Sequence, residues 1–300
     1  MTLLTLKYGM FSADNIHRIY KHDILPYADV GVRISDPSMM IWLERMFTCF
    51  GNVTGKRILD FGAASGHKAL LLSKLGATVF AVDMADESII RMKHARQISG
   101  INFKIIKGND SYLLTIDPGT FDLILCGEVI EHIRPSKLPT FLDSMHNILS
   151  PGGKLFLTTP NFDVYGPAEN SAEYFEHSPF GHYKHYSITE LINLLDQASF
   201  QICNYWYECH PLTRLRNHIF YPLAQYDNAL YASNRFQLIR YALRPLSWIF
   251  HLIMDGIYPI SYRLQRMYEY KRSKISTGMT IMIDAEKIIS NGNQPKSRLQ

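Results

Sequence analysis

The segment RILDFGAASGHKALLLSKLG, residues 57–76, passes from the pattern of a β-strand to the pattern of an α-helix. Its first part, RILDFG at 57–62, is a short apolar run that ends in glycine, which is typical of a buried strand. The second part, GHKALLLSKLG at 66–76, has helical spacing and also ends in glycine. A buried strand that turns directly into a helix is the repeating unit of α/β proteins.

The same alternation continues along the chain. Apolar strand-like runs recur, and helix-like segments separate them, as expected for a parallel sheet that is covered on both faces. We therefore predict an α/β fold with a doubly wound sheet. The further strands are expected at 78–83, 101–108, 121–127, 152–160 and 200–208, with another strand-like run at 278–288, and the further helices at 87–100, across 128–149 and at 187–200.

The bulk composition indicates a globular protein. Of the 300 residues, 47% are hydrophobic and 19% are charged, and a formal charge of +4 does not by itself argue for nucleic acid. The start of the chain lacks the pattern of a signal peptide, and no run reaches the roughly 20 apolar residues of a spanning helix. No close CxxC pair occurs, which fits a reducing cytoplasm, where we expect the protein. The cysteines are Cys49, Cys126, Cys203 and Cys209.

The turn DFGAASG after the first strand is suited to a ligand. Gly62 and Gly66 allow a tight turn and a close approach of the backbone, and the following helix N-terminus favours negative charge. A nicotinamide-binding oxidoreductase is one alternative, but its fingerprint is GxGxxG, whereas these glycines fall as GxxxG with Ala64 between them. Asp83 ends the second strand about 20 residues later, where a carboxylate can accept both ribose hydroxyls of an adenosine cofactor. A solvated helix cap is the simpler interpretation of Asp83.

Four segments together resemble the successive motifs of class I S-adenosylmethionine-dependent methyltransferases: ILDFGAASG, VFAVDMADESI, FDLILCGEVIEHI and LSPGGKLFLTTPN. The resemblance covers about residues 55–207, and it implies a Rossmann-like, seven-stranded sheet in which 278–288 is the last, antiparallel strand. Ala64 departs from the family, which usually has glycine there. We expect its methyl group to be tolerated if the backbone of this residue keeps a negative φ.

The resemblance also implies which residues hold S-adenosylmethionine. Asp60, Gly62 and Gly66 would line the methionine half of the cofactor, and Asp83 would hold the ribose. The acidic position that meets the adenine amine falls on either Asn109 or Asp110, because the spacing of KGNDSY leaves both open. Further cofactor-binding candidates are Ala63, Met84 and Gly127.

The stretch CGEVIEHIRP, residues 126–135, combines Glu128, Glu131 and His132, which would share one face of a helix. In the simplest interpretation, Glu128 caps a helix start and the other two residues are exposed. In a second, Glu128 is part of the pocket wall and His132 or a later histidine is a general base. In a third, the three residues bind a divalent cation that holds two oxygen atoms of the substrate.

The third interpretation rests on a resemblance. ExxEH at this place is similar to ubiquinone-pathway O-methyltransferases and small-RNA 2′-O-methyltransferases, in which these residues and a later histidine bind Mg²⁺ or a similar ion. GHYKHYSITEL offers His182 and His185, and the resemblance favours His185. Two histidines would also suit Mn²⁺ or Fe²⁺. The candidate metal ligands are therefore Glu128, Glu131, His132 and His185, and the candidate catalytic residues are His132, His185 and Glu128.

Residues 160–186 form a long connection that is rich in aromatic residues. Connections of this length inside a compact domain are usually functional or disordered, and the aromatic content argues against disorder. We predict an active-site lid, with a surface loop packed by its own aromatics as the alternative. The aromatic residues are Phe162, Tyr165, Tyr174, Phe175, Phe180 and Tyr183.

Two segments are added to the core. We expect residues 1–50 to form an N-terminal helical cap, with helical spacing in DPSMMIWLERMFTCFG, and residues 51–209 with 277–290 to form the cofactor-binding domain. Residues 210–276 are an insert between the last two strands, and 291–300 are a tail. Residues 211–275 hold ten basic and three acidic residues, a net charge of +7, together with many aromatics. This helical insert would suit an anionic membrane surface, a substrate cover, an arm of a homo-oligomer, or helices with a solvated basic face.

From the sequence we predict an S-adenosylmethionine-dependent methyltransferase that modifies an oxygen of a small or lipid-linked acceptor, such as a quinone precursor or a saccharide. Its cofactors would be S-adenosylmethionine and a Mg²⁺ or Mn²⁺ ion. An RNA 2′-O-methyltransferase is an alternative that suits ExxEH, but no RNA-binding module is recognisable and we expect no nucleic-acid partner. A catalytically idle cofactor-binding or membrane scaffold is another. The protein would be cytoplasmic, with a peripheral position at the inner face of a membrane if the insert binds lipid.

Overall fold

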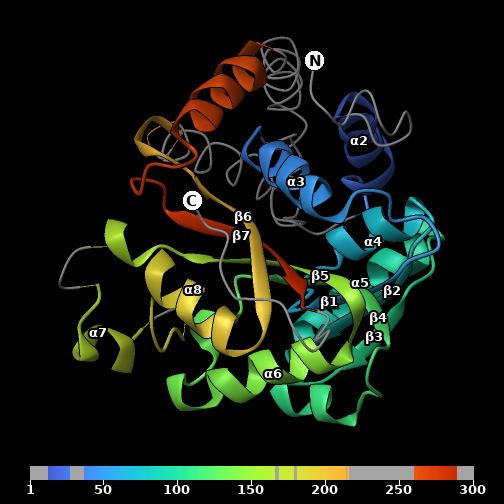
Figure 1. The fold of residues 1–300 in the computed structure, drawn as a ribbon. Coiled ribbons are helices and arrows are strands. Elements are labelled where there is room, and N and C mark those ends of the chain that lie inside the picture. Colours follow the sequence, from blue (N-terminus) through green and yellow to red (C-terminus); the bar gives the residue numbers. More distant parts are fainter. Residues whose placement is uncertain are drawn as a thin grey trace, which may run out of the picture.

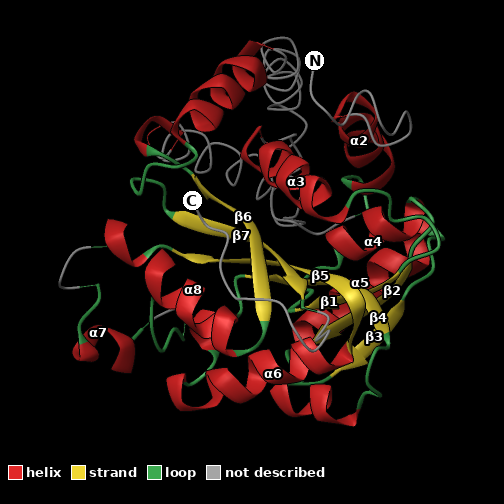
Figure 2. Cartoon of the chain, viewed as in Figure 1, coloured by secondary structure: helices red, strands yellow, loops and turns green. Residues whose placement is uncertain are grey.

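The computed structural model describes residues 13–27, 37–165, 169–178, 181–213, 215 and 260–288. A seven-stranded sheet runs through its centre (Figures 1 and 2), with the strand order β3-β2-β1-β4-β5-β7-β6. The strands are β1 (Arg57–Phe61), β2 (Thr78–Asp83), β3 (Lys104–Lys107), β4 (Phe121–Gly127), β5 (Leu149–Pro160), β6 (Phe200–Glu208) and β7 (Thr280–Lys287).

The sheet is mixed in the way the sequence predicts. The first five strands pair in parallel, whereas β7 pairs antiparallel with both β5 and β6. The antiparallel β7 therefore starts, at Thr280, on the edge where β5 and β6 end, since Thr280 faces Pro160 on one side and Glu208 on the other. Chain from the insert thus enters the sheet at the edge where ligands bind in open α/β sheets.

Helices cover both faces of the sheet. One core contains buried residues of α2, η2, α3, α4 and α5, and the other contains those of α6 and α8; Figure 1 shows α3 and α6 on opposite sides. The helices are α2 (Ala13–Ile19), α3 (Pro37–Phe50), α4 (His67–Lys74), α5 (Asp86–Ser99), α6 (Leu138–Ile148), α7 (Ala172–Glu176) and α8 (Ile188–Gln197), with a π-turn η2 (Tyr20–Ile24) and short 3₁₀ turns η3 (Asp110–Thr115), η4 (Ile130–His132), η5 (Pro135–Lys137) and η6 (Phe162–Val164).

Local sequence signals explain where α8 begins. The Ser187 hydroxyl accepts a hydrogen bond from the backbone N–H of Glu190 at 3.3 Å, and the Glu190 carboxylate accepts one from the backbone N–H of Ser187 at 3.1 Å. This capping box satisfies two N–H groups that a helix start would otherwise leave open. It also fixes the direction in which the preceding residues, including His185, approach the sheet.

The insert is described only near its two ends. A helix at 260–272 packs beside α3, and β7 follows it after a short turn (Figure 1, orange-red). Residues 216–259, which carry much of the predicted basic and aromatic surface, lie outside the described residues, so a membrane role for 211–275 stays a prediction. Among the helices that the structure describes, none is both long and apolar enough to cross a bilayer.

Candidate active site

The turn between β1 and α4 requires glycine at two positions. Gly62 has φ 78° and Gly66 has φ 77°, in the left-handed region that side chains rarely adopt. A Cβ atom would lie 2.4 Å from Val129 Cγ2 at Gly62 and 2.7 Å from Met92 Cγ at Gly66. Both positions therefore exclude a side chain for two independent reasons, and the turn presents bare backbone toward the edge of the sheet.

Ala64 lies in the same turn and does not meet the condition under which we expected its methyl group to be tolerated. That condition was a negative φ, whereas the φ of Ala64 is 49°. An L-residue in this conformation costs about 1 kcal/mol relative to glycine. The backbone N–H of Ala64 donates a hydrogen bond of 2.8 Å to Asp83 Oδ2, which helps to hold the strained turn.

Asp83 joins two loops at the end of β2. Besides the bond from Ala64, its Oδ1 accepts a hydrogen bond of 2.9 Å from the backbone N–H of Ala85. Each carboxylate oxygen can accept a second bond, and the residue is half-exposed. The side chain is therefore held in place and keeps acceptor capacity for a ligand. Met84, between Asp83 and Ala85 in the sequence, is 71% exposed.

Asp60, at the end of β1, is a buried carboxylate. It is only 1% exposed, and neither of its carboxylate oxygens accepts a hydrogen bond from any residue that the structure describes. Burial raises its pKa to about 6, with Lys68 acting in the opposite direction and Asp83 adding to the rise. A buried carboxylate without donors is costly, so its position favours a ligand that brings hydrogen-bond donors.

Asn109 and Asp110 now differ in their roles. Asn109 Oδ1 caps η3, because it accepts hydrogen bonds from the Ser111 backbone N–H at 3.2 Å and from the Ser111 hydroxyl at 2.6 Å. Asp110 makes an ion pair of 3.6 Å with Lys137, which is mostly exposed. The carboxylate of Asp110 therefore has more acceptor capacity left than the amide of Asn109.

Of the helices that the sequence predicts across 128–149, the α-helical part is confirmed only from Leu138, where α6 begins. Before it, Glu128 has φ 57°, and residues 130–132 and 135–137 form two short 3₁₀ turns. A left-handed residue interrupts helical hydrogen bonding, so the three polar side chains do not share one helix face. Glu128 instead turns back to β5, where its backbone N–H donates to the Thr158 carbonyl at 2.9 Å and its carboxylate accepts from Thr158 Oγ1 at 2.8 Å. Glu128 is exposed, yet desolvation by the surrounding protein raises the pKa of its carboxyl group.

Glu131 is buried beside two histidines. It is 1% exposed, its Oε2 accepts a 3.0 Å hydrogen bond from Thr159 Oγ1, and its Oε1 has no hydrogen-bond partner within the described chain. Burial, and after it the charge of Glu128, raises its pKa to about 9. One ligand atom each from Glu131, His132 and His182 lie within 4.8 Å of one another, a spacing that suits one metal ion.

The structure therefore brings together two of the four predicted metal ligands, Glu131 and His132, with His182. The favoured His185 lies behind His182, with His182 Nδ1 3.0 Å from His185 Nε2. Burial lowers the pKa of His182 to about 4 and also lowers that of His185. Both rings are thus neutral near pH 7, the form in which a histidine binds a metal.

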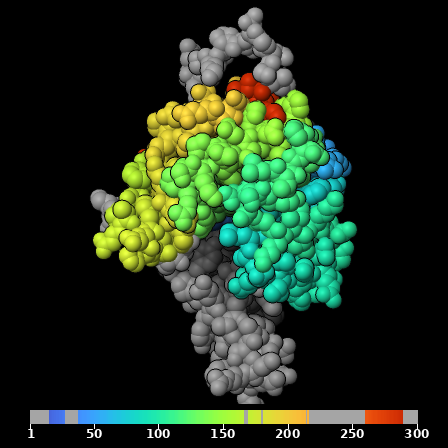
Figure 3. All heavy atoms as spheres, turned by 90° about the horizontal axis from the view of Figure 1, so that it is seen from below, coloured from blue at the N-terminus to red at the C-terminus, as the bar shows by residue number. Residues whose placement is uncertain are grey.

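Aromatic residues of 160–186, the segment that the sequence predicts to be a lid and that is called the lid below, contact His185. Tyr165 stacks on its ring at 4.2 Å between centroids, and Phe175 meets it edge-on at 5.0 Å. The lid is also hydrogen-bonded to Glu131, because the Tyr183 backbone N–H donates to the Glu131 carbonyl at 2.7 Å. In the view from below (Figure 3), the lid, in yellow-green, lies next to the green segment that contains α6. Phe180 lies outside the described residues.

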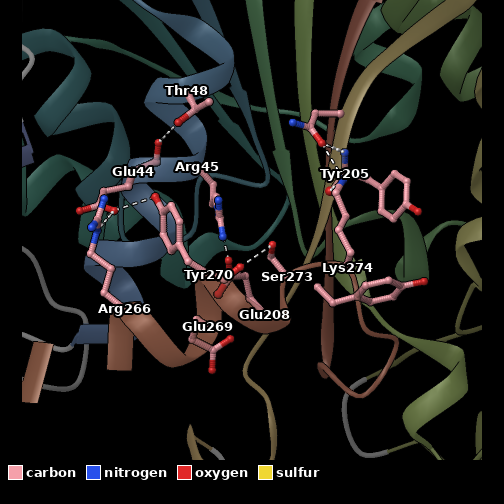
Figure 4. Close-up of polar contacts among 12 residues, drawn as sticks. Glu44, Arg45, Thr48, Tyr205, Glu208, Arg266, Glu269, Tyr270, Ser273 and Lys274 are labelled. Carbon is pink, nitrogen blue, oxygen red and sulfur yellow. Dashed lines mark hydrogen bonds and ion pairs between the residues drawn. The ribbon is translucent and has the colours of Figure 1, made fainter. Parts of the chain in front are cut away.

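A polar network on the insert side gave no signal in the sequence. Glu44 of α3, 1% exposed, accepts hydrogen bonds from Arg266 Nε at 2.8 Å, from the Tyr270 hydroxyl at 2.9 Å and from the Tyr262 hydroxyl. The next residue, Arg45, donates to Glu208 at 2.8 Å. Figure 4 shows Glu44 and Arg45 facing the helix of residues 260–272. The partners are more than 160 residues apart along the chain, so no local motif could reveal them.

Comparisons with known proteins identify the family of this chain. A family profile described as a methyltransferase domain matches residues 37–204. Ubiquinone biosynthesis O-methyltransferase of Coxiella burnetii is 32% identical over 148 residues, which cover 48% of this chain and 59% of that protein, so the chain spans about three fifths of the length of such relatives.

Solved structures share the fold. A S-adenosylmethionine-dependent methyltransferase from Archaeoglobus fulgidus superimposes with a TM-score of 0.51 at 18% identity, over 84% of this chain and 95% of its own. Another from Mesorhizobium loti gives a TM-score of 0.52 at 14% identity, over 82% and 98%. With a family match across more than half of its length and this fold, the chain belongs to the methyltransferase domain family, in the class I S-adenosylmethionine-dependent group.

Proposed function

We propose that the protein transfers the methyl group of S-adenosylmethionine to an oxygen atom of a small or lipid-linked acceptor, such as a quinone precursor or a saccharide. The observation that carries the proposal is the buried Asp60 carboxylate, which no described residue supplies with a hydrogen bond, beside a glycine turn at the end of β1. The amino group of the methionine half would supply donors there, and burial makes an unsatisfied carboxylate costly enough to favour it.

The remaining cofactor contacts follow from the same edge of the sheet. Asp83 would accept the ribose hydroxyls with the oxygen lone pairs that its two backbone donors leave. The capping role of Asn109 favours Asp110 as the partner of the adenine amine. Met84 offers an exposed apolar side chain to the adenine face. Ala63 and Gly127 would contribute backbone near the methionine half.

Methyl transfer needs positioning more than activation, because the sulfonium methyl is already electrophilic. The acceptor oxygen must approach to about 3 Å along the line of the breaking bond, and its proton must be taken up. Glu128 and His132 are exposed groups at the end of β4 that could take this proton. The buried His185 would act through its contact with His182 rather than touch the acceptor.

The residues present also fit a divalent cation. Glu131, His132 and His182 would hold it, supported by their mutual distances and by the Glu131 oxygen that accepts no hydrogen bond from the described residues. Such an ion would lower the pKa of an acceptor hydroxyl. His185 would then orient His182, as residues behind a metal ligand commonly do. Mn²⁺ would suit this nitrogen-rich set as well as Mg²⁺.

The test is transfer of labelled methyl from S-adenosylmethionine to 3,4-dihydroxybenzoate, a minimal quinone precursor, with and without chelator. We expect O-methylated product, its loss in chelator, and its return with Mg²⁺ or Mn²⁺. Glu131→Gln should abolish the response to metal, whereas His177→Gln, at the exposed end of α7, should not. Full activity in excess chelator would exclude the metal ion and leave general acid/base catalysis as the interpretation of these residues. Absence of methyl transfer to dihydroxybenzoate and to monosaccharides alike, in protein that binds the cofactor, would contradict the acceptor class.

A further inference from the structure

A cavity of about 200 Å³ lies between α3, the ends of β6 and β7, and the helix of residues 260–272. An apolar cavity of about 150 Å³ is enough for benzene, so this one accommodates a six-membered ring with one substituent. Its walls are apolar on one side and polar on the other. The residues that matter below are Met39, Trp42, Met282, Glu208, Gln265 and Glu269.

Trp42 places this cavity next to the proposed cofactor site. Its ring lines the cavity, and its Cζ2 atom lies 3.4 Å from the position that a Cβ atom would take on Gly127. Lys68, which follows the glycine turn, lies over the same ring at 5.0 Å. Trp42 therefore contacts both the cavity and the end of β4, where the proposed cofactor site lies, so an acceptor in the cavity would be close to that site.

On the polar side of the cavity, two acceptors receive no hydrogen bond from the described residues. Glu269 is 1% exposed; its Oε1 accepts hydrogen bonds from the His210 backbone N–H at 3.1 Å and from the Thr213 hydroxyl, but its Oε2 receives none from the described residues and lies 3.9 Å from His210 Nε2. Gln265 donates to Ser38 at 2.8 Å, while its Oε1 likewise has no donor in the described part of the chain. Two buried acceptors without donors call for a ligand that donates.

The charges point in the same direction. Glu208 and Glu269 face the cavity, and Arg45 pairs with Glu208 at 2.8 Å. No Lys or Arg is among the described residues that line the cavity, so an ionised Glu269 carboxylate would be a buried negative charge without a cation at the cavity wall, which is costly. Figure 4 shows Arg45 directed at Glu208, on the side of α3 that faces the 260–272 helix, with Glu269 on that helix.

We propose that this cavity binds a ring-sized, positively charged amine, and that it is the subsite for the part of the acceptor that carries this amine. This rests on the proposed function only in naming the occupant as the acceptor. The ammonium group would donate to Glu269 Oε2 and to Gln265 Oε1, and the ring would lie against Trp42 and the two methionines. An ammonium beside Trp42 also gains a favourable cation–π interaction.

A proton would take the place of the amine in the free protein. Burial, opposed by Arg45 and strengthened by Glu269, raises the pKa of Glu208 to about 8. Among the described residues, Cys209, His210, Tyr270, Arg272 and Lys274 are further ionisable groups near this pair. Burial lowers the pKa of His210, so its ring is neutral. When an ammonium enters, the carboxylates need no proton, so binding should release one proton. A neutral ligand should release none.

The experiment is calorimetry with benzylammonium as the probe, benzyl alcohol as its neutral counterpart, and S-adenosylhomocysteine as the check on the cofactor site. Benzylammonium should bind at least tenfold more tightly than benzyl alcohol. Titration in two buffers of different ionisation enthalpy should show release of about one proton at pH 7. The affinity for benzylammonium should rise about tenfold between pH 6 and pH 7 and level off above pH 8, because Glu208 has a pKa of about 8.

Glu269→Gln should weaken benzylammonium at least tenfold and leave S-adenosylhomocysteine unchanged, while Glu286→Gln, at the other end of β7, should change neither. The measurements on the unchanged protein stand even if Glu269→Gln does not fold. Equal binding of the amine and the alcohol, or no proton release, would overturn the inference. So would absence of amine binding in protein that binds S-adenosylhomocysteine. Failure to bind S-adenosylhomocysteine would instead contradict the proposed function.

Discussion

The cofactor side and the insert side of this molecule are built from contacts of very different range. We define the cofactor side as the ends of β1, β2 and β4 with the loops that follow them, and the insert side as α3, the ends of β6 and β7, and the 260–272 helix. On the cofactor side, Ala64 bonds to Asp83, 19 residues away. On the insert side, Glu44 bonds to Arg266, 222 residues away. The cofactor side can therefore be recognised from sequence motifs, whereas the insert side can be recognised only from the three-dimensional structure.

The largest expected effect breaks the cofactor side. In Gly62→Val, the new side chain would have to enter the space of Val129 Cγ2, 2.4 Å from its Cβ, on a backbone with φ 78°. We expect affinity for S-adenosylhomocysteine to fall more than about 100-fold, or the protein to lose several kcal/mol of stability. Calorimetry and thermal unfolding measure both.

Gly55→Ala is the matched control. Gly55 has a similar φ of 74°, but among the described residues no atom lies within 4 Å of a Cβ placed there. The Gly55→Ala variant should therefore lose only about 1 kcal/mol of stability, from its strained backbone, and keep its affinity for S-adenosylhomocysteine. If Gly62→Val bound as tightly as Gly55→Ala, the turn would not approach the cofactor.

The second effect separates the two sides. Glu44→Ala leaves Arg266, Tyr262 and Tyr270 without their common acceptor, and removing one partner of such a buried network should destabilise the protein by about 3 kcal/mol. Hydrogen exchange should rise in 260–272, with affinity for S-adenosylhomocysteine unchanged. Glu87→Ala, whose pairing with Arg91 is exposed, should change stability by less than about 0.5 kcal/mol. Loss of cofactor affinity in folded Glu44→Ala would mean that the two sides are coupled.

The third effect is a response to pH that differs in sign between two buried residues, His67 on the cofactor side and Glu208 on the insert side. Burial lowers the pKa of His67 to about 3, so below its ordinary value of 6.5 the unfolded chain binds a proton that the folded chain does not. Stability is therefore lost as pH falls from 6.5 toward 3, by about 2 kcal/mol at pH 5. Glu208, with its pKa raised to about 8, keeps a proton that the unfolded chain releases above pH 4.5, so its effect is a loss of stability as pH rises toward 8.

His67→Gln should remove the share of the acid-side loss that comes from His67, about 2 kcal/mol at pH 5, and unfolding measured from pH 4.5 to 8 in both proteins tests this. Glu208→Gln should flatten the opposite, alkaline side of the profile. Identical acid-side slopes for His67→Gln and the unchanged protein would show that His67 titrates normally and is not enclosed beside the glycine turn.

The smallest effect concerns the strained turn. Ala64→Gly removes a methyl group from a residue with φ 49°, so we expect a gain of about 1 kcal/mol in stability with little change in cofactor affinity. Thermal unfolding is the measurement. A destabilised Ala64→Gly would mean that the Ala64 side chain contributes packing that outweighs its backbone strain.

The central strands β1, β2 and β4 were predictable because each is a mostly apolar run closed by glycine or a polar residue. All seven strands appear near the expected residues. The helices expected across 128–149 begin later than predicted, because nothing local signals that Glu128 adopts a left-handed backbone. Glu131 and His132 were singled out as metal ligands by the resemblance of ExxEH, and the structure places them near each other. Whether His182 or His185 lies beside them depends on the path of the lid. Arg45 and Glu208 meet across 163 residues, which the sequence pattern does not encode.

The most direct test of the central claim, that the β1–β2 edge binds S-adenosylmethionine, is calorimetric titration of Asp60→Asn with S-adenosylhomocysteine. Asp60 should form a charge-assisted hydrogen bond with the ligand, worth roughly 1.5–3 kcal/mol, so affinity should fall about 10- to 100-fold. The exposed Asp117→Asn should bind like the unchanged protein. Undiminished affinity in folded Asp60→Asn, or tighter binding of NADH than of S-adenosylhomocysteine by the unchanged protein, would contradict the claim.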